Sequence, residues 1–403
     1  MKKIILRLKN LIFNLGSLAV IFPIFLMKDF LSSKKQSVSI NKITWFGAYG
    51  NGNLGDDLIF YSLKRLLNKN DIEINLSIRD FEKAKNYGVQ LFSKGEQFFD
   101  FWSYKKRIKE CDAVFLGGGG LLEYYYPSKQ AYRMLLIYLC PLMLARIYGK
   151  PSYVVGMGVN SDKIQNSFFR FIYRSILSSC KLIITRDEKS KNGLIGNGVE
   201  TNIIASFDPV LSLDLPLREP FDSNKKTIGF LLWPYFLWPH FYENAESLPE
   251  SKRKKHENFV EQLQQSIKTL SKEYNIKLLT FHFSDTILYK ELEMTFEEKA
   301  SLGTFLKSIA QVDLVVSMRY HGIITSVLNE IPVISIDVQQ KMDAIMRNYD
   351  LYNYNIKVDD FSKDTLLSKV KHIEDNNVDT LKKIQDKNKE VKQNIRKSYS
   401  EIL

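Results

Sequence analysis

The sequence of 403 residues contains little cysteine and little histidine. Its three cysteines, Cys111, Cys140 and Cys180, have no C-x-x-C spacing, which excludes a disulfide framework and a metal site built from thiolates. The five histidines form no H-x-x-x-H or H-E-x-x-H pattern, so we expect no dedicated metal site. The cysteines are typical of small core residues in a protein of a reducing compartment.

The sequence also lacks any strong bias in its amino-acid composition. Hydrophobic residues make up 45% and charged residues 25% of the chain, which excludes collagen-like, coiled-coil and largely disordered proteins. The length favours two or three domains, at about 100–200 residues each. The 57 Lys and Arg residues outnumber the 45 Asp and Glu residues and give a net charge of +12. That charge favours an anionic partner, whether nucleic acid, acidic lipid or a phosphorylated or acidic substrate.

One long apolar run lies at residues 11–27. Its 17 residues are fewer than the about 20 that a spanning helix needs, and they include Asn14, Gly16 and Pro23. No A-x-A-like cleavage site follows, as a signal peptide would require. A short or tilted span, an interfacial anchor held by the flanking Lys and Arg residues, and a helix packed on the globular domain remain open. We expect residues 1–40 to associate with a membrane.

From residue 41 onward, short apolar segments alternate with segments of helical periodicity. Residues 43–48 (ITWFGA) and 113–116 (AVFL) are short, apolar and adjacent to glycines, which is typical of buried parallel strands. Residues 57–67 have the spacing of an amphipathic helix. Strands separated by helices predict βαβ units in a doubly wound parallel sheet.

A break in this alternation indicates a domain boundary. Residues 213–226 contain two prolines and a polar cluster, which is typical of a linker, and the alternation begins again after them. We therefore predict an α/β fold of two Rossmann-like, doubly wound domains, at residues 41–215 and 225–350, that face each other across a cleft. A charged helical tail with no clear hydrophobic face at its end follows at residues 351–403.

A glycine-rich turn follows the first predicted strand. Gly50, Gly52 and Gly55 match G-x-G-x-x-G in the strand-to-helix position of a dinucleotide-binding fold. Asp56 and Asp57, however, would lie in the first turn of the helix, where they compete with a phosphate for the helix dipole. The two acids therefore favour a helix that is stabilised by its own carboxylates over a nicotinamide or flavin site.

Two further segments follow predicted strands. The four glycines at 117–120 let the backbone come close to a ligand or to the facing domain, or they form a structural turn. Arg186 follows a predicted strand at 181–185, at the edge of the sheet where ligands bind. Asp187 is placed to hold the Arg186 guanidinium, and an ordinary surface ion pair is the alternative.

The most specific cluster is MRYHG at residues 318–322, which leads from a predicted strand at 313–317 into a helix. Arg319 and His321 thus lie where a strand ends and a helix begins. An arginine fork beside free N–H groups favours an anion site, and a histidine there can exchange a proton with the bound group. A histidine satisfied within the loop is the alternative for His321.

Residues 233–242 combine aromatic side chains with two prolines, so they form neither a regular helix nor a central strand. Their rings are candidates to stack on sugars or to touch a lipid carrier, with packing between the domains as the alternative. The basic run KRKK at 252–255 is expected in a solvated loop, which would also suit an anionic membrane surface. His240 and His282 are candidates to line the cleft, whereas His256 and His372 are expected in solvent.

Taken in order, these motifs resemble those of the polysaccharide pyruvyl transferase family. The resemblance covers about residues 43–350, and Lys341 stands where the family tends to carry a lysine. Asp57 stands where the family commonly has glutamate, and Glu330-Ile331 where many members have a glycine. The matching segments are NLGDD at 53–57, GGGGLLE at 117–123, GMGV at 156–159, TRDEKS at 185–190, FDPVLSL at 207–213, SMRYHG at 317–322 and IPVISI at 331–336.

The resemblance implies a transferase that moves a pyruvyl group from phosphoenolpyruvate onto two hydroxyls of a sugar, giving a cyclic pyruvate ketal and free phosphate. It also implies an architecture like that of the B-type glycosyltransferases, with no metal or redox cofactor. The implied partners are phosphoenolpyruvate as co-substrate, a glycan or lipid-linked oligosaccharide as acceptor and a membrane surface, but not nucleic acid. We expect the catalytic domain on the cytoplasmic face of the cell membrane, because the reaction needs a cytosolic substrate.

The chemistry of this reaction indicates roles for the charged residues of the motifs. Phosphoenolpyruvate carries a carboxylate and a phosphate, so its site needs at least two cations close together. Arg186 and Arg319 would supply them across the cleft, with Lys341 as a third. His321 would be the acid/base that handles protons at the substrate, an effect typically worth about 10²–10⁴-fold in rate.

The first domain would complete the site. Asp56 or Asp57 would activate the sugar hydroxyl. Four residues are expected to approach the substrate through their backbone or short side chains: Gly52, Asn53, Gly118 and Gly119.

Three rival functions remain open on the sequence alone. The nearest is a B-type glycosyltransferase, which would bind a nucleotide sugar in its second domain and release a nucleotide rather than phosphate. A nicotinamide enzyme would use the glycine-rich turn but is disfavoured by Asp56 and Asp57. A membrane-bound glycan-binding protein without catalysis is disfavoured by the presence of both Arg319 and His321.

Overall fold

The structure, a computed structural model, describes most of the chain after residue 38. The described residues are 25, 39–67, 72–78, 80–84, 87–93, 101–123, 129–215, 225–238, 248–296 and 301–402. The apolar run 11–27, which we predict to associate with a membrane, lies outside them except for Phe25. No helix within these ranges is long and apolar enough to cross a membrane.

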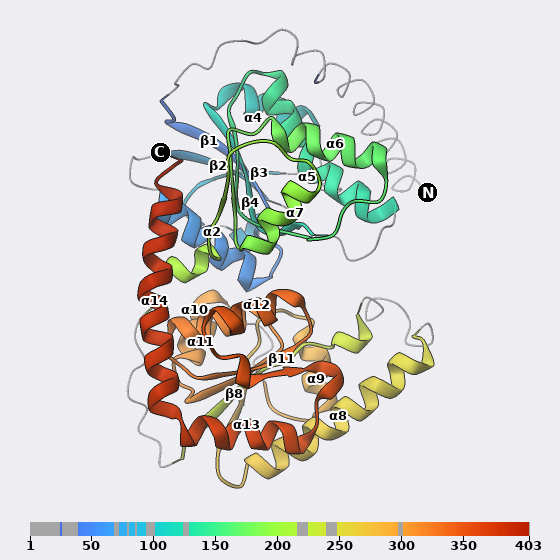
Figure 1. The fold of residues 1–403 in the computed structure, drawn as a ribbon, viewed down its shortest axis with the longest axis vertical. Helices are drawn as coiled ribbons and strands as arrows, with labels where there is room; N and C mark the ends of the chain where they lie inside the picture. Colours follow the sequence, from blue (N-terminus) through green and yellow to red (C-terminus); the bar gives the residue numbers. More distant parts are fainter. Residues whose placement is uncertain are drawn as a thin grey trace. The chain divides into compact units, whose positions relative to one another are not determined.

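The chain forms two compact units, each built on one sheet (Figure 1). The first unit contains the described residues up to Gly52, Asp56–Ser212 and the end of the chain from Asn394. The second unit contains Asn53–Gly55 and Leu213–Gln393. Most of the predicted linker, at 216–224, lies outside the described residues, and so does His240, which we predicted to line the cleft.

The first unit has a seven-stranded sheet in which every neighbouring pair is parallel. Its strands are β1 (Lys42–Phe46), β2 (Glu73–Ile78), β3 (Gln90–Ser93), β4 (Ala113–Leu122), β5 (Ser152–Val159), β6 (Leu182–Thr185) and β7 (Ile203–Ala205). They lie in the order β3-β2-β1-β4-β5-β6-β7, which reverses between β1 and β4. A reversal of this kind is where open α/β sheets bind ligands.

The helices of the first unit pack their apolar faces on this sheet. They are α2 (Leu54–Leu67), α3 (Phe81–Ala84), α4 (Phe101–Glu110), α5 (Lys129–Ile147), α6 (Ser167–Ser178) and α7 (Glu188–Gly196). One hydrophobic core contains buried residues of α4, α5, α6 and α7 together with β4, β5 and β6. Side chains that match known capping preferences begin two of the helices: the Asn166 side chain accepts the Phe169 N–H before α6, and Asp187 accepts the Ser190 N–H before α7.

The second unit has a five-stranded sheet that is also parallel throughout. Its strands are β8 (Thr227–Leu231), β9 (Asn275–Leu278), β10 (Leu314–Ser317), β11 (Val333–Asp337) and β12 (Asn355–Lys357). The order β12-β11-β10-β8-β9 reverses between β8 and β10, so this sheet has a reversal point of its own. The helices are α8 (Glu250–Leu270), α9 (Asp285–Glu291), α10 (Leu302–Ile309), α11 (Tyr320–Leu328), α12 (Gln340–Asn348), α13 (Lys363–Asp375) and α14 (Asn377–Tyr399).

Two predictions for the basic N-terminal part of helix α8 are wrong. The run 252–255 lies in this helix, so the prediction of a loop there is wrong. His256, expected in solvent, is buried, and its Nε2 lies 2.6 Å from Glu291 Oε2. Phe259 and Leu263 are buried at helical spacing from it, and this apolar stripe carries His256 inward. His372 is exposed, as predicted.

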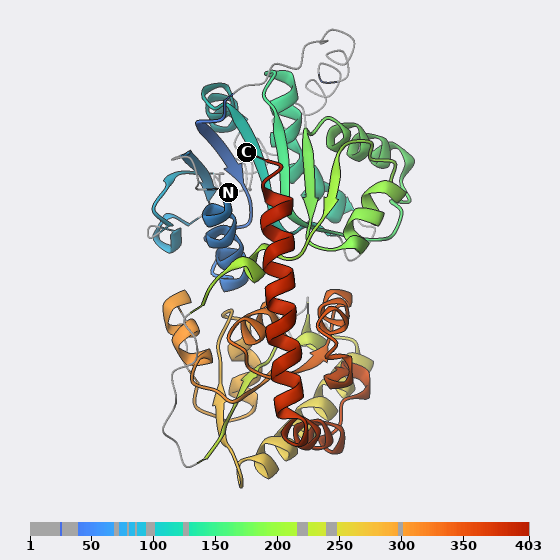
Figure 2. The same cartoon turned by 60° about the vertical axis from the view of Figure 1, so that its left-hand side comes forward.

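Helix α14 is a single long helix (Figure 2). The prediction that the tail has no clear hydrophobic face at its end is wrong, because a buried stripe continues into its last turns. Asn388 in this stripe is also buried, donates to Val327 O at 2.7 Å and accepts the Tyr349 O–H at 2.8 Å. Many charged residues between the apolar positions hide the stripe in the sequence. The stripe consists of Ile384, Val391, Ile395 and Tyr399.

The predicted α/β fold with parallel sheets is confirmed. The apolar runs at 43–48 and 113–116 form β1 and the first part of β4, and the helix predicted at 57–67 is α2. The cleft between two domains stays a prediction.

Candidate active site

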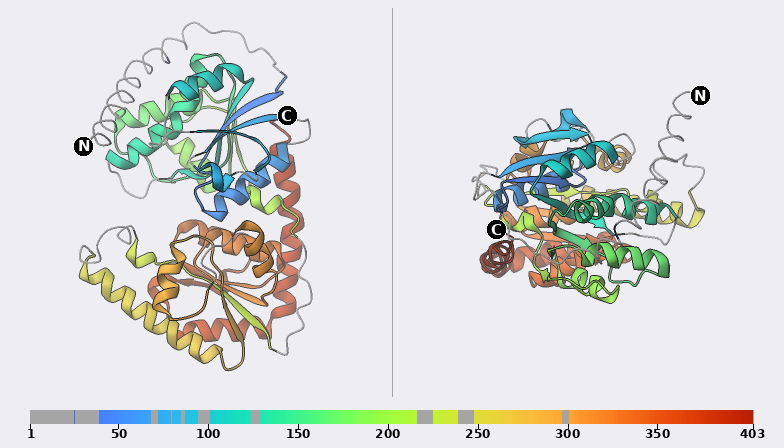
Figure 3. Two further views of the ribbon diagram at one scale, coloured as in Figure 1. Left: turned by 180° about the vertical axis from the view of Figure 1, so that it is seen from behind. Right: turned by 90° about the horizontal axis from the view of Figure 1, so that it is seen from above.

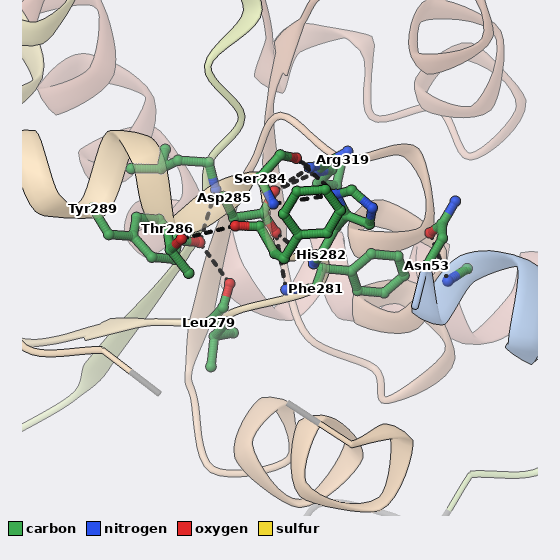
Figure 4. Close-up of polar contacts among 12 residues, drawn as sticks. Asn53, Leu279, Phe281, His282, Ser284, Asp285, Thr286, Tyr289 and Arg319 are labelled. Carbon is green, nitrogen blue, oxygen red and sulfur yellow. Dashed lines mark hydrogen bonds and ion pairs between the residues drawn. The ribbon is translucent and has the colours of Figure 1, made fainter. Parts of the chain in front are cut away.

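Four loops meet at the carboxyl edge of the second sheet. Because its strands are parallel, the residues that follow β8, β9, β10 and β11 come together at one edge. Trp233 follows β8, Arg319 and His321 follow β10, and Lys341 lies in the first turn of α12 after β11. The loop after β9 contributes residues 281–285 (Figure 4). The strand order reverses between β8 and β10, so this edge has the topology of a ligand site.

Arg319 is held there by a buried carboxylate. Its Nε donates to Asp285 Oδ1 at 3.0 Å (Figure 4). Its Nη2 also donates to Asp285 Oδ1, and it donates to Ser284 Oγ at 2.9 Å. Asp285 is fully buried, and its Oδ2 accepts the N–H groups of Phe281 at 2.9 Å and His282 at 2.8 Å. Both carboxylate oxygens are therefore engaged, and the guanidinium is fixed along one edge.

Burial and charge act on this pair in opposite directions. Burial raises the pKa of Asp285, and the charge and hydrogen bonds of Arg319 offset part of that rise. The Arg319 Cζ also lies 5.3 Å from the centre of the Trp233 ring, within the range of a cation–π contact. With Nε and Nη2 engaged, Nη1 has no hydrogen-bond partner among the described residues. One edge of the guanidinium is thus structural and the other can bind an anion.

Tyr289 fixes the helix that carries Asp285. Its hydroxyl donates to Leu279 O at 2.6 Å and accepts the Leu232 N–H at 3.3 Å (Figure 4). Leu279 directly follows β9 and Leu232 directly follows β8. The phenol therefore ties α9 to two strand ends and places Asp285, the first residue of α9, against Arg319.

Ser317 and Gly322 close the turn between β10 and α11. Ser317 Oγ accepts the Arg319 N–H at 3.0 Å and donates to Arg319 O at 2.8 Å. A Cβ on Gly322 would lie 2.3 Å from Ser317 Oγ, so this position requires glycine. Arg319 is the N-cap residue of α11, but its side chain does not cap the helix. The side chain bonds to Asp285 and Ser284 instead.

His321 and Lys341 lie at the same edge as Arg319. The His321 ring is nearly parallel to that of Phe281, with centroids 6.2 Å apart and an angle of 11° between the planes. Tyr320 meets the His321 ring edge-on, with centroids 5.2 Å apart, and its own ring centre lies 5.5 Å from Lys341 Nζ. The structure thus brings Arg319, His321 and Lys341 together, while their roles toward a substrate stay predictions.

Asp57 supports the glycine-rich turn of the first unit. Its carboxylate accepts the Gly50 N–H at 3.2 Å and the Tyr87 O–H, and the residue is buried. Burial and the nearby Asp57 charge raise the pKa of Tyr87, so the phenol keeps the proton that it donates. Gly50 and Gly52 have positive φ angles of 70° and 83°, which the tight turn requires. These contacts favour a structural role for Asp57 over activation of a sugar hydroxyl.

Asp56 lies in the first turn of α2 and approaches β4. Its Oδ1 is 3.2 Å from the point where a Cβ on Gly119 would lie. Asn53 directly precedes α2, and its Oδ1 accepts the Gly55 N–H at 3.1 Å. The turn after β1 and the glycines of β4 lie where the first sheet reverses its order. Asp56 therefore lies near the reversal point of its own sheet.

The four glycines at 117–120 lie inside strand β4, so the alternative of a structural turn is wrong. A Cβ on Gly117 would lie 2.0 Å from Val155 O, and one on Gly118 would lie 2.7 Å from Ile59 Cγ2. The glycines let β4 pack closely against β5 and α2, which explains their lack of side chains. The expected approach of Gly118 and Gly119 to a substrate stays a prediction.

Arg186 is buried and paired, so the alternative of a surface ion pair is wrong. Its Nη2 forms an ion pair with Glu123, and its Nε lies 3.7 Å from Asp187 Oδ2. A Cβ on Gly158 would lie 2.4 Å from Arg186 Nη2, so the guanidinium packs directly on β5. Two carboxylates therefore balance the charge that we predicted to bind phosphoenolpyruvate, and that role stays a prediction.

The sequence did not point to Ser284, Asp285 or Glu123. Glu123 ends the GGGGLLE motif, which was the available signal for it. Asp285 lies 34 residues before Arg319, and nothing local to either residue indicates that they pair. The one usable signal was position, because an acid soon after a strand of a parallel sheet lies at the ligand-binding edge.

No metal-binding cluster occurs in the part of the chain that the structure describes: no group of three or more His, Cys, Asp and Glu side chains there could hold an ion. The three cysteines are free and buried, as expected of core residues. Burial raises the pKa of each thiol, which disfavours the thiolate form that metals bind.

Solved structures define the class of fold. HepE from Anabaena, solved with UDP and glucose, is 11% identical, with a TM-score of 0.57 over 90% of this chain and 99% of that one. UDP-GlcNAc 2-epimerase from Neisseria meningitidis, bound to UDP-GlcNAc, is 11% identical, with a TM-score of 0.56 over 89% and 98%. A glycosyltransferase from Rickettsia africae ESF-5 is 12% identical, with a TM-score of 0.56 over 91% and 98%. These likenesses show the fold alone and confirm its resemblance to the B-type glycosyltransferases.

A family model identifies the family. The model named polysaccharide pyruvyl transferase matches residues 53–340. The chain therefore belongs to the polysaccharide pyruvyl transferase family and is a transferase, as the motifs predicted. No curated protein matches the chain.

We predict that Glu123→Gln destabilises the protein and that Glu188→Gln does not. Without the Glu123 carboxylate the buried Arg186 charge loses its closest partner, which should lower the free energy of unfolding by about 3 kcal/mol. The Glu188 side chain is 65% exposed and lies 3.8 Å from Lys191, so its loss should change the same quantity by less than about 0.5 kcal/mol. Urea denaturation measures both variants, and equal stabilities would contradict the buried ion pair.

Proposed function

We propose that this transferase moves a pyruvyl group from phosphoenolpyruvate onto two hydroxyls of a sugar in a cell-surface polysaccharide or its lipid-linked precursor, and releases phosphate. Family membership supports this class of reaction. The observation that carries the proposal is the geometry of Arg319, which Asp285 and Ser284 hold along one edge while Nη1 stays available beside the start of α11.

The charges at the edge of the second sheet suit a substrate with two anionic groups. Arg319 Nη1 would donate to an anionic oxygen, and hydrogen bonds between ionised groups are roughly twice as strong as neutral ones. The charge of Arg319 itself is balanced by Asp285. Lys341, and His321 when it is protonated, would add positive charge at this edge. The start of α11 adds N–H groups and the positive end of a helix dipole.

The reaction requires proton transfer at carbon and at oxygen. In our proposal His321 donates a proton to the methylene carbon of phosphoenolpyruvate, which becomes a methyl group and leaves an oxocarbenium-like carbon beside it. The first sugar hydroxyl adds to that carbon and loses its proton. The bond from this carbon to the phosphate oxygen then breaks, and the second hydroxyl adds and closes the ketal. Of the two hydroxyl protons, one restores His321 and the other leaves with the phosphate.

Residues of the first unit and of the glycine-rich turn would serve the acceptor. Asp56 is the preferred base for the sugar hydroxyl, because Asp57 is already bonded within the glycine-rich turn. The proton that Asp56 accepts would pass to the leaving phosphate. Arg186 remains a candidate ligand that would act through its hydrogen bonds rather than its net charge. Four residues are proposed to lie close to the substrate: Gly52, Asn53, Gly118 and Gly119.

We further propose that the reaction takes place on the cytoplasmic face of the cell membrane. Phosphoenolpyruvate is a cytosolic compound, and a lipid-linked acceptor would lie at the membrane surface. The apolar run 11–27, flanked by Lys and Arg residues, would attach the protein there. The chemistry needs no metal and no redox cofactor, because no electrons are transferred and phosphate is already a good leaving group.

A glycosyltransferase that uses a nucleotide sugar is the second candidate. It is favoured by the likeness in fold to HepE, which was solved with UDP and glucose. Such an enzyme would bind a nucleoside diphosphate at the edge of the second sheet. The two candidates differ in the co-substrate that binds there.

Titration calorimetry separates these candidates. Phosphoenolpyruvate should bind the full-length protein, and Arg319→Ala should weaken that binding by about 2–5 kcal/mol, since it removes one partner of a desolvated ion pair. Arg319→Lys keeps the charge but lacks the fork, so it should recover only part of the affinity. Arg253→Ala, on an exposed position of α8, is the matched control and should bind like the wild type. Binding of a nucleotide sugar without binding of phosphoenolpyruvate would refute the proposal.

A second prediction concerns His321. His321→Ala should lower the rate of phosphate release by about 10²–10⁴-fold, because the acid/base is lost, while phosphoenolpyruvate still binds. His372→Ala, at an exposed position of α13, should release phosphate at the wild-type rate. A wild-type rate for His321→Ala would show that another group handles the proton.

A further inference from the structure

The first unit carries exposed aromatic side chains on two helices. Trp102 on α4 is 61% exposed, and on α6 Phe168 is 68% and Phe171 is 39% exposed. On the same helices Tyr104 and Tyr173 are buried in the core of the unit. The exposed rings therefore lie on the outward faces of α4 and α6. Large apolar side chains that gather on a surface mark an interaction site.

These two helices belong to one layer with α5 (Figure 3). Helix α5 contacts both α4 and α6, and all three bury residues in the same core beside the sheet. The three outer faces therefore form one surface of the first unit. We call it the α4–α6 face.

The α4–α6 face belongs to a strongly basic layer. Its three helices contain nine Lys and Arg residues and a single acidic residue, Glu110. Their net charge is +8, compared with +12 for the whole chain of 403 residues. Helices α5 and α6 contain no Asp or Glu. Most of the excess positive charge of the protein is thus concentrated here.

Two cations of this layer lie beside exposed rings, and several have no acidic partner within the described residues. Lys105 Nζ lies 4.9 Å from the centre of the Trp102 ring, and Arg174 Cζ lies 5.8 Å from that of Phe171. Five of the cations form no ion pair with any carboxylate in the described part of the chain: Lys105, Lys106, Lys109, Arg170 and Arg174.

The basic run of α8 shows that charge alone does not make such a surface. There Lys254 pairs with Glu250 at 2.9 Å, and Lys255 pairs with Asp359 at 2.6 Å. No large hydrophobic side chain of α8 is exposed. Exposed aromatic side chains among the cations thus distinguish the α4–α6 face from the basic run of α8, which serves as an internal control.

We propose that the α4–α6 face docks on an anionic lipid bilayer. Trp102, Phe168 and Phe171 would enter the headgroup region, where amphipathic and apolar rings gain free energy, and the cations beside them would meet lipid phosphates. Nucleic acid would also attract these cations. A bilayer is favoured because the chain has a second feature that suits lipid, the apolar run 11–27 flanked by basic residues.

This docking adds a membrane partner to the proposed function. It depends on that function in one respect, the assumption that the acceptor is linked to a lipid. A face held on the membrane would keep the first unit near an acceptor whose carrier cannot leave the bilayer. The charge and exposure of the face do not depend on which reaction the enzyme catalyses.

Co-sedimentation of the full-length protein with vesicles tests the proposal. The vesicles contain equal amounts of phosphatidylglycerol and phosphatidylcholine, or phosphatidylcholine alone. The protein should bind the anionic vesicles more tightly. Lys106→Ser combined with Arg174→Ser should weaken that binding about 30-fold, because each cation near an anionic surface contributes about 1 kcal/mol. Trp102→Ser combined with Phe168→Ser should weaken it about tenfold or more through lost apolar contact.

Matched variants control for charge and for apolar surface. Arg253→Ser combined with Lys254→Ser removes two cations from α8, and Val378→Ser removes a side chain of α14 that is 79% exposed. Each control should change vesicle affinity less than about twofold. All substituted residues are exposed, so thermal melting should show that each variant stays folded.

Three results would overturn the proposal. Equal weakening by the α8 control would mean that net charge alone attracts the protein. Unchanged binding of both α4–α6 variants would place the attachment elsewhere on the chain. Binding of a single-stranded RNA that Trp102→Ser combined with Phe168→Ser abolishes, without binding to vesicles, would assign the face to nucleic acid. Arg319→Ala should bind vesicles like the wild type, so a failure of docking and a failure of the proposed reaction give different results.

Discussion

The ion pair between Arg319 and Asp285 is the interaction on which the site of the second unit depends. A buried carboxylate is costly unless it is paired and hydrogen-bonded, and Asp285 meets both conditions through Arg319 and two backbone N–H groups. Tyr289 holds α9 against two strand ends, so the carboxylate stays in place. An arginine that is already ordered loses little further rotamer freedom when it binds an anion. The site is therefore pre-organised before any substrate arrives.

The two sheets place their motifs by the same topological rule. In the first sheet the glycine-rich turn follows β1 and the run of glycines lies in β4, on either side of the reversal in strand order. In the second sheet Trp233 follows β8 and Arg319 follows β10, again on either side of a reversal. Loops diverge at such points and leave room for a ligand. Short motifs that are unspecific one by one thus become informative through their order along the chain.

The fold could be predicted from the sequence, because buried parallel strands are apolar runs and the helices between them show a helical spacing of apolar residues. Sequence reasoning also identified Arg319 and His321, because they directly follow a strand. It missed Asp285, since a pairing across 34 residues depends on the order of strands in the sheet, which no local pattern encodes. It left the glycines at 117–120 open because a missing side chain serves a turn and close packing equally well. It did not predict the apolar stripe of α14, because many charged residues separate the apolar positions in the sequence.

The most direct test of the account is the affinity of Asp285→Asn for phosphoenolpyruvate, measured by calorimetry. The amide keeps the shape of the side chain but not the charge that orients Arg319. Since a lost hydrogen bond to a charged group costs about 1.5–3 kcal/mol, the account predicts that affinity falls about tenfold or more. Asp343→Asn, which changes the acid paired with Arg347 on α12, should leave affinity unchanged. Wild-type affinity in Asp285→Asn would contradict the claim that this carboxylate organises the site.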